Sequence, residues 1–196
     1  YINSHYVIMA TKNGQVKKTS LEQYSRPRTN GINAITIKDG DELLEAKLTT
    51  GDSQVMLAVK SGKAIRFEEE KTRSMGRNAS GVRGIRLNSH NDEVIGMITI
   101  NESESDVLVV SENGYGKRSS LEDYRITNRG GKGVKTISVT EKTGSLVAIK
   151  NVTDSDDLMI INKSGIAIRL EVDNLRVMGR ATQGVRLIKV RDGDAI

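Results

Sequence analysis

The stretch Val107-Leu-Val-Val-Ser-Glu-Asn-Gly114 decides the fold of this chain, because runs of the same kind occur four times. Each is an apolar, β-rich run that ends in Asn-Gly or Ser-Gly, the pattern of a strand that leads into a tight hairpin turn. The four runs are Tyr6–Gly14, Val55–Gly62, Val107–Gly114 and Leu158–Gly165. Their glycines are 48, 52 and 51 residues apart, which is typical of propeller blades rather than of helical repeats. We therefore expect one repeat domain, 1–196, with units at about 5–53, 54–105, 106–156 and 157–196, the last incomplete.

The rest of each unit also has the pattern of strands and turns. A second short strand follows each hairpin glycine, and then a loop rich in Gly and Arg. An alternating apolar segment comes next, which predicts a third strand, at Ile32–Ile37, Val82–Leu87, Val134–Val139 and Val185–Val190. An acidic turn leads into a further strand, as at Leu43–Leu48 and Val94–Ile100, and the best helical candidate, Ser20–Tyr24, is one short turn. The sequence predicts an all-β fold in which four-stranded blades pack side by side.

The units also alternate in type. Units one and three have Lys17-Lys-Thr-Ser20 and Lys117-Arg-Ser-Ser120 after the turn. Units two and four have Ala64-Ile-Arg66 and Ala167-Ile-Arg169 there, and later Met75-Gly-Arg77 and Met178-Gly-Arg180. Duplication of a two-unit ancestor explains this alternation.

Composition excludes several kinds of site. The 196 residues include 30 Lys and Arg against 25 Asp and Glu, a formal charge of +5. There is no Cys, which excludes thiol catalysis, disulfides and Cys-ligated zinc, and the two His leave little for a histidine-based site. No apolar run approaches the ~20 residues of a membrane helix. The first residues have no targeting pattern, so we expect an intracellular piece of a larger protein.

Basic residues recur at one position of the repeat, four residues after each turn glycine: Lys18, Arg66, Arg118 and Arg169. Strand alternation places Arg66 opposite Ile65 and Phe67, so we expect the apolar pair to face the core and the cation to face solvent. One such cation on every blade predicts a basic stripe around the outer rim, which suits a polyanion. The alternative is that these bases only discourage pairing between sheet edges.

The loop Asn128-Arg-Gly-Gly-Lys-Gly133 is the most unusual stretch of the chain. Consecutive glycines allow backbone N–H groups to face a phosphate while Arg and Lys supply charge. A tight turn or β-bulge is the alternative, and a Walker A loop is excluded because no Gly-Lys-Ser/Thr follows. The candidate DNA contacts are Lys17, Lys18, Arg26, Arg28, Arg66, Arg73, Arg77, Lys117, Arg118, Arg125, Arg129, Lys132, Arg169, Arg176 and Arg180, with Gly130, Gly131 and Gly133 in the loop.

The aromatic content indicates which nucleic acid is expected. Five Tyr and one Phe are few for a protein that stacks single-stranded bases. No helix suits a major groove, which speaks against readout of sequence. Contact with the backbone of duplex DNA remains, and it would depend on salt and not on sequence.

Catalysis has little support in the sequence. The acidic residues that come in pairs are Asp39, Asp41, Asp92, Glu93, Asp192 and Asp194. They fall on turns at equivalent positions, where Asp is a common turn former. We expect neither a catalytic residue nor a metal site.

Three segments resemble the C-terminal domain of the bacterial DNA gyrase A subunit: Asn13–Thr19, Ser74–Leu87 and Asn113–Arg118. The resemblance covers essentially the whole chain. It implies a β-pinwheel, a propeller-like ring or spiral whose neighbouring blades exchange strands. This chain would supply about four to five four-stranded blades of a six-bladed array.

The resemblance also implies a function, which is wrapping of duplex DNA around the basic rim so that an ATP-dependent type II topoisomerase introduces negative supercoils. The fragment itself would be non-catalytic and hold no cofactor, with ATP and Mg²⁺ used in other domains. Its partners would be double-stranded DNA, the rest of the gyrase A subunit and the gyrase B subunit in a heterotetramer, with no membrane. The location would be the bacterial cytoplasm, at the nucleoid.

One departure and two alternatives accompany the resemblance. The family's signature box, Gln-Arg-Arg-Gly-Gly-Lys-Gly, normally lies in the first blade, whereas Asn128–Gly133 lies in the third unit and lacks the leading Gln-Arg. We interpret it as the equivalent loop of a later blade. The alternatives are the C-terminal domain of the topoisomerase IV A subunit, with weaker wrapping, and a propeller that docks an acidic protein.

Overall fold

The four apolar runs form the first strands of four antiparallel hairpins in the computed structural model, which describes residues 4–101 and 105–196. The hairpins are β1 (Tyr6–Thr11) with β2 (Gln15–Ser20), β4 (Gln54–Val59) with β5 (Lys63–Glu68), β8 (Asp106–Ser111) with β9 (Tyr115–Ser120), and β12 (Asp157–Ile161) with β13 (Ala167–Glu171). Three further strands, β3 (Leu43–Thr49), β7 (Val94–Ile100) and β11 (Leu146–Val152), pair with β1, β4 and β8. The strands predicted at Leu43–Leu48 and Val94–Ile100 are thereby confirmed.

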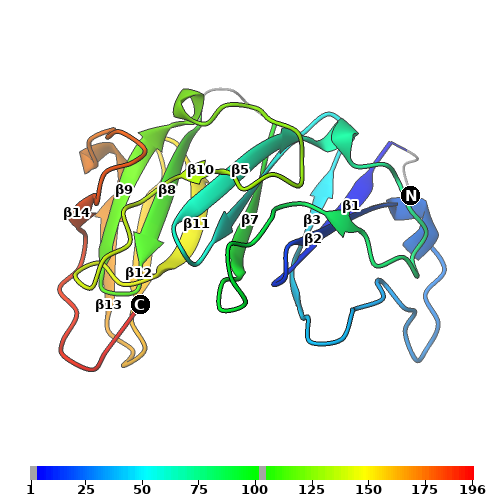
Figure 1. Cartoon of the computed structure of the whole chain (residues 1–196), viewed down its shortest axis with the longest axis horizontal. Coiled ribbons are helices and arrows are strands. Elements are labelled where there is room, and N and C mark those ends of the chain that lie inside the picture. The colour runs from blue at the N-terminus through cyan, green and yellow to red at the C-terminus, as the bar shows by residue number, and fades with distance from the viewer. Residues whose placement is uncertain (1–3, 102–104) are drawn as a thin grey trace.

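The fourth strand of each complete sheet comes from the next unit along the chain. These short strands are β6 (Val82–Arg83), β10 (Val134–Lys135) and β14 (Val185–Arg186), and they pair with β2, β5 and β9. The described residues thus form three four-stranded sheets, β3-β1-β2-β6, β10-β5-β4-β7 and β11-β8-β9-β14, and a two-stranded sheet β12-β13. The sheets follow one another across the molecule in chain order (Figure 1). The strand exchange of a β-pinwheel is confirmed.

Helical structure in the described residues is limited to single 3₁₀ turns. They are η1 (Leu21–Tyr24), η2 (Glu69–Lys71), η3 (Leu121–Asp123) and η4 (Val172–Asn174), one after the second strand of each hairpin. The single turn expected at Ser20–Tyr24 is confirmed. None of the helical segments described is long and apolar enough to cross a bilayer.

The alternating segments are shorter strands than predicted. Only Val82–Arg83, Val134–Lys135 and Val185–Arg186 pair as strands, and residues 32–37 form no strand. The chain leaves the ladder because Gly84 and Ile85 both donate their N–H groups to the carbonyl of Gly14, at 2.7 and 3.3 Å. The alternation reflects burial of Ile85, which is 1% exposed, rather than strand pairing.

Neighbouring sheets share cores, and β4 lies between two of them. Val55, Leu57 and Val59 pack toward the first sheet, whereas Met56 and Ala58 pack toward the third. A strand buried on both faces is continuously apolar, and this explains the run from which the repeat is recognised. The third core joins the third sheet to the fourth unit through Leu108, Val110, Val152 and Val172.

The hairpin glycines make close contact between units. Gly62 has a positive φ of 93°, and a Cβ there would lie 2.7 Å from the carbonyl oxygen of Ile137 in the next unit. The carbonyl of Gly62 also accepts from Thr136 and Ile137. Glycine is therefore required both for the turn and for the approach of the following unit.

Candidate nucleic-acid interface

Lys17 and Lys117, which were predicted to contact DNA, are buried at 0% and 1% exposure. The ammonium of Lys117 donates to the carbonyl oxygens of Gly179 and Thr182, at 3.1 and 2.8 Å, and to that of Arg180. Lys17 donates to the carbonyls of Ala34 and Arg77. Burial, and secondarily the charge of Arg77 or Arg180, lowers the pKa of each lysine to about 8. Their prediction as DNA contacts does not fit this burial, because both ammonium groups hold loops of the chain in place.

The predicted stripe at Lys18, Arg66 and Arg118 does not face solvent either. Lys18 and Arg118 are each 7% exposed, and Arg66 is half-buried. Alternation correctly turns these side chains away from Ile65 and its equivalents. That face, however, is covered by the next unit, through parallel bridges from the three residues to Ser74, Ile126 and Val177.

The three side chains bind the 3₁₀ turn of the unit that covers them. Lys18 lies 3.4 Å from the carboxylate of Glu69, and Arg66 donates to the carbonyls of Leu121 and Tyr124 at 3.0 and 2.9 Å. Arg118 pairs with Asp106 at 2.7 Å and Asp154 at 2.5 Å and donates to the carbonyl of Val172 at 3.2 Å. Arg169, by contrast, is exposed and pairs with Asp157. The expectation of a solvent-facing cation therefore holds only for Arg169.

The loop arginines Arg77, Arg129 and Arg180 reach back to the preceding unit. Arg129 donates to the carbonyls of Lys71 and Arg83, both at 3.0 Å. Arg180 donates to those of Asp123, at 3.1 Å, and Lys135, and Arg77 donates to that of Asn33 at 3.0 Å. All three guanidinium groups are half-buried, so only part of each is accessible to a phosphate.

Six predicted contacts are exposed and keep their charge available. They are Arg26, Arg28, Arg73, Arg125, Lys132 and Arg176. Within 4–101 and 105–196, none of these six side chains forms an ion pair or a hydrogen bond. Arg73, Arg125 and Arg176 occupy equivalent positions, one residue before the bridging residues Ser74, Ile126 and Val177.

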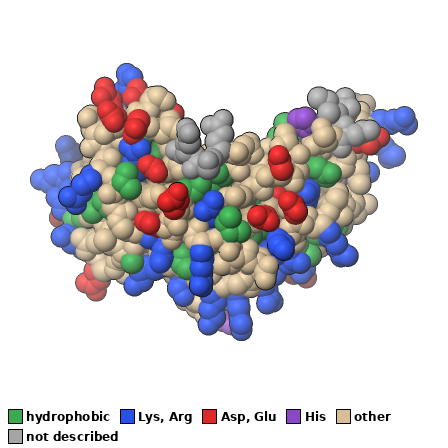
Figure 2. Space-filling model, turned by 90° about the horizontal axis from the view of Figure 1, so that it is seen from above, with side chains coloured by type: hydrophobic (Ala, Val, Ile, Leu, Met, Phe, Trp, Pro, Cys, Tyr) green, Lys and Arg blue, Asp and Glu red, His purple; other side chains and the backbone are tan. Residues whose placement is uncertain are grey.

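Sequence reasoning missed three exposed bases on the exchanged strands, Arg83, Lys135 and Arg186. The signal was present, because a base follows the first Val of the alternating segment in three units. Arg86 and Lys189 are further exposed bases on these segments. In Figure 2, Lys and Arg side chains gather along the lower edge of the view, while the Asp and Glu side chains that are visible lie mostly in its middle and at its upper left.

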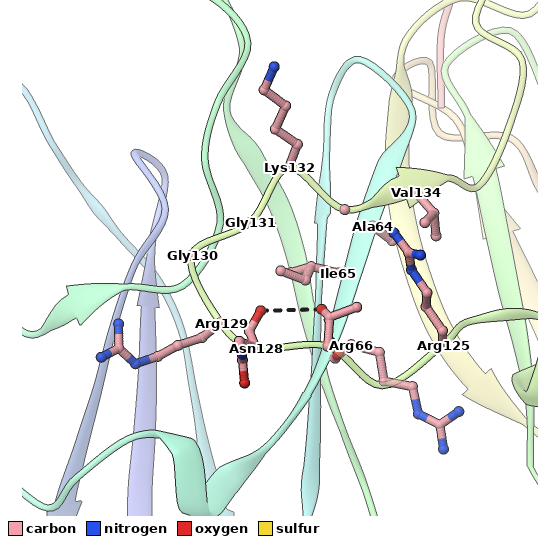
Figure 3. Close-up of a pocket in the computed structure, with 12 residues that line it drawn as sticks. Ala64, Ile65, Arg66, Arg125, Asn128, Arg129, Gly130, Gly131, Lys132 and Val134 are labelled. Atoms are coloured by element: carbon pink, nitrogen blue, oxygen red, sulfur yellow. Dashed lines mark hydrogen bonds between the residues drawn. The ribbon is translucent and has the colours of Figure 1, made fainter.

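The loop Asn128–Gly133 borders a cavity of about 460 Å³ against β5 that is open to solvent on one side (Figure 3). Its lining includes Arg66, Arg125, Arg129 and Lys132 and no carboxylate. The loop is fixed by two backbone hydrogen bonds, from Gly130 to Gly84 at 2.7 Å and from Arg86 to Gly131 at 2.8 Å. The side chains of Arg66, Arg129 and Lys132 spread outward from it in different directions (Figure 3).

The same loop differs from its equivalents in the residue that lies beneath it. The loops of units two and four turn carbonyl oxygens toward the ammonium groups of Lys17 and Lys117. Ile65 stands at that position under the third loop, where a Cβ on Gly131 would contact its side chain at 3.6 Å. In the part of the chain that the structure describes, the N–H groups of Gly131 and Lys132 have no protein acceptor. Free donors and surrounding cations favour an anion here.

The acidic turns have the structural role that was expected of them. Asp92 accepts from the N–H and hydroxyl of Ser61 at 3.1 and 2.7 Å, and Asp41 accepts from the N–H of Asn13 at 2.9 Å. Asp194 accepts from the hydroxyl of Ser164 at 2.6 Å. No group of three or more potential metal ligands occurs among the described residues. The turn-forming interpretation is confirmed for these three carboxylates.

Comparison with known proteins gives one consistent match. The profile of a family described as "DNA gyrase C-terminal domain, beta-propeller" matches residues 5–50, 54–101, 105–153 and 156–196. The DNA gyrase A subunit of Staphylococcus epidermidis (strain ATCC 12228) is 46% identical over 192 residues, which are 97% of this chain and 21% of that protein. The DNA gyrase A subunit of Chlamydia pneumoniae is 45% identical over 195 residues, 99% of this chain and 23% of that protein. The chain thus spans about a fifth of the length of these relatives.

Two solved structures share the fold over almost the whole chain. A DNA gyrase A C-terminal domain superposes with a TM-score of 0.87 at 25% identity, covering 99% of this chain and 64% of the other. A topoisomerase IV C-terminal domain superposes with a TM-score of 0.91 at 23% identity, covering 98% and 60%. The second similarity establishes the fold alone.

Proposed function

Because this chain belongs to the family of DNA gyrase C-terminal domains, we propose that it binds duplex DNA along the outer edge of its sheets and wraps it there. The observation that carries the proposal is the recurrence of Arg73, Arg125 and Arg176, exposed and unpaired, at equivalent positions on successive sheets. A polyanion that runs across the sheets meets one such cation on each of them. The attraction depends on phosphates, so it is independent of base sequence and falls with salt.

Two features support a double-stranded ligand. Among the described aromatic side chains, Phe67, Tyr115 and Tyr124 are buried and Tyr6 and Tyr24 are half-buried, so none offers a fully exposed platform on which single-stranded bases could stack. The described residues contain no helix longer than a single 3₁₀ turn, and a major groove is usually read by a helix. Backbone contact with a duplex is the binding mode that remains.

The basic residues have two different roles, one structural and one in DNA binding. Lys17, Arg66, Lys117 and Arg118 bind oxygen atoms of the neighbouring unit and hold the sheets in a fixed arrangement. The exposed cations neutralise phosphates along the path that this arrangement sets. The loop Asn128–Gly133 adds a cavity in which the free N–H groups of Gly131 and Lys132 donate to one phosphate of the backbone, with the exposed cations Arg125 and Lys132 in its lining.

In the longer protein, this domain presents a wrapped DNA segment to a topoisomerase. A positive wrap places a crossing at the enzyme core, where ATP-driven strand passage converts it into negative supercoils. The chain takes no catalytic part, and ATP and Mg²⁺ act in other domains. Its protein partners are the rest of the gyrase A subunit and the gyrase B subunit, in the bacterial cytoplasm.

Ligation of nicked circular DNA in the presence of the chain tests the proposal. Wrapping in the positive sense raises the linking number of the closed circles, and the rise grows with protein concentration. Retardation of DNA in a gel without any change in linking number would contradict wrapping and match the weaker behaviour expected of a topoisomerase IV domain. Binding that is insensitive to salt and to duplex length would contradict DNA binding on the edge and favour an acidic protein partner.

A further inference from the structure

The bases near the outer edge fall into two classes. In one class the side chain is bonded to backbone carbonyl or carboxylate oxygens of another element: Lys17, Lys18, Arg66, Arg77, Lys117, Arg118, Arg129 and Arg180. In the other class the side chain is exposed and recurs at two equivalent positions, ten residues apart in units two, three and four. We call these residues edge pairs: Arg73 with Arg83, Arg125 with Lys135, and Arg176 with Arg186.

Each edge pair brackets the outer side of one sheet. In the first sheet, Ser74 bridges Lys18 of β2, and Arg83 is opposite Gln15 of the same strand. Positions 15 and 18 are about 10 Å apart along a strand. The other two sheets repeat the arrangement through Ile126 with Arg66 and Lys135 with Lys63, and through Val177 with Arg118 and Arg186 with Tyr115.

Neighbouring edge pairs are linked through the backbone. Arg129, four residues after Arg125, donates to the carbonyl oxygen of Arg83 on the preceding sheet at 3.0 Å. Arg180, four residues after Arg176, donates to that of Lys135. The loop that carries one edge pair therefore also fixes the backbone of the pair before it. The spacing between pairs is set by the packing of the sheets.

One member of the third pair is also positioned by an aromatic side chain. The guanidinium of Arg186 donates to the hydroxyl of Tyr115 at 3.0 Å and lies 5.5 Å from the centre of its ring. Lys142 approaches the same ring at 5.6 Å. A neutral partner holds Arg186 in place and leaves its charge uncompensated.

Resting on the proposed function, we propose that the three edge pairs are the principal phosphate contacts of the duplex, with one pair on each sheet. Duplex DNA carries about one negative charge per 1.7 Å of its axis, so an edge of about 10 Å faces several phosphates whatever the sequence. Two cations that flank such an edge contact the backbone at two points. The pairs of successive sheets then fix the direction in which the duplex crosses them.

Removal of one member of each pair tests this assignment. The variant carries Arg83→Gln, Lys135→Gln and Arg186→Gln, and its affinity for a linear duplex that crosses all three sheets is measured by fluorescence anisotropy over a range of salt. Three lost phosphate contacts lower the slope of log affinity against log salt by about 2.7 and weaken binding at low salt by roughly tenfold or more. Charge-preserving exchanges at the same positions, Arg83→Lys, Lys135→Arg and Arg186→Lys, retain most of the slope.

A matched control removes three positive charges elsewhere, again one per sheet. Lys47 is on β3, Lys60 follows β4 and Lys150 is on β11, and all three lie away from the exchanged strands. Lys47→Gln, Lys60→Gln and Lys150→Gln together change the slope of log affinity against log salt by less than about 0.9, which is the change expected for one lost phosphate contact. If the control lowers this slope as much as the edge variant does, the assignment of the edge pairs as phosphate contacts is wrong, and net charge alone explains the attraction.

The remaining outcomes separate the two proposals. If the unmodified chain binds duplex in a salt-dependent way and the edge variant binds equally well, the edge pairs are wrong and the proposed function stands. If the unmodified chain does not bind duplex at low salt, the proposed function fails and the edge pairs fail with it. Thermal unfolding of every variant is measured alongside. Should the triple variant unfold, Lys135→Gln alone is used, for which the expected loss of slope is about 0.9.

Discussion

The guanidinium of Arg129 donates a hydrogen bond to the backbone carbonyl of Arg83 at 3.0 Å, which joins a loop of the third unit to a strand of the second. The same guanidinium donates to the carbonyl of Lys71 at 3.0 Å. Arg129 thus holds two segments of the preceding unit, although its surroundings in the sequence are those of a phosphate-binding loop. Lys132, three residues later, is exposed and forms no such bond within the described residues.

We predict that Arg129→Met mainly lowers the stability of the fold, whereas Lys132→Met mainly weakens duplex binding. The first leaves two carbonyl oxygens without their charged donor and lowers the free energy of unfolding by roughly 2 kcal/mol. The second changes the free energy of unfolding by less than about 0.5 kcal/mol and lowers the salt slope of duplex binding by about 0.9. Urea unfolding and anisotropy titrations measure the two effects. Equal stability of the two variants would show that the Arg129 hydrogen bonds do not hold the units together.

Arg118 and Arg169 occupy the same repeat position and are expected to differ in stability. Arg118→Met removes a 7% exposed guanidinium from Asp106 and Asp154. Because Asp106, whose side chain is 19% exposed, and the carbonyl of Val172 are left without their charged donor, the free energy of unfolding falls by about 2 kcal/mol. Arg169→Met removes an exposed ion pair with Asp157, which contributes little to stability. Thermal unfolding of both variants measures the difference, and a similar midpoint for the two would refute the covering of Arg118 by the fourth unit.

The repeat could be predicted from the sequence because it depends on local features, namely strand burial and turn conformation. The run Val55–Val59 is apolar at every position since β4 is buried on both faces, and the hairpin Gly62 must have a positive φ. The strand exchange could come only from the family resemblance. Pairing of β6 with β2 joins residues about 66 positions apart, and nothing in either segment alone specifies that partner.

The basic rim was predicted only in part, for a reason that Arg66 illustrates. Alternation in β5 fixes the face on which Arg66 lies, and that prediction is correct. Whether the face is open depends on Leu121 and Tyr124 of the next unit, whose carbonyls accept from this guanidinium. Exposure in a repeat protein is set by the neighbouring unit, so a pattern within one strand cannot supply it. Arg83 was missed for the converse reason, because strand exchange carries it to an outer edge.

The buried lysines predict a pH dependence of stability. The pKa of Lys117 is lowered from 10.5 to about 8 in the folded chain, chiefly by burial. Between these two values the unfolded chain holds the proton more strongly than the folded chain, so the free energy of unfolding rises as the pH rises from about 8 toward 10. Lys17, with the same lowered pKa, contributes in the same direction.

Urea unfolding at a series of pH values checks this prediction. Lys117→Met removes one of the two lowered groups, so the rise between pH 8 and 10 becomes smaller. Lys150→Met, which removes an exposed lysine of β11, leaves the rise unchanged. A stability that falls over this range in the unmodified chain, or a rise that survives replacement of both Lys17 and Lys117, contradicts the lowered pKa values.

Gly133 and Gly31 end the Gly-rich loops of the third and first units, and we predict that alanine is tolerated at only one of them. Both have a positive φ, 76° and 79°, so each substitution costs about 1 kcal/mol in backbone strain. A Cβ at Gly133 would also lie 2.5 Å from the carbonyl oxygen of Ala64, whereas nothing lies within 4 Å of one at Gly31. Gly133→Ala must therefore push the loop away from β5, which opens the cavity and disturbs the pairing of Val134 with Ala64.

We expect Gly133→Ala to lower the unfolding midpoint further than Gly31→Ala and to weaken duplex binding as well. Thermal unfolding and anisotropy titrations measure both effects, and equal midpoints with equal affinities would mean that the third loop does not depend on its contact with β5.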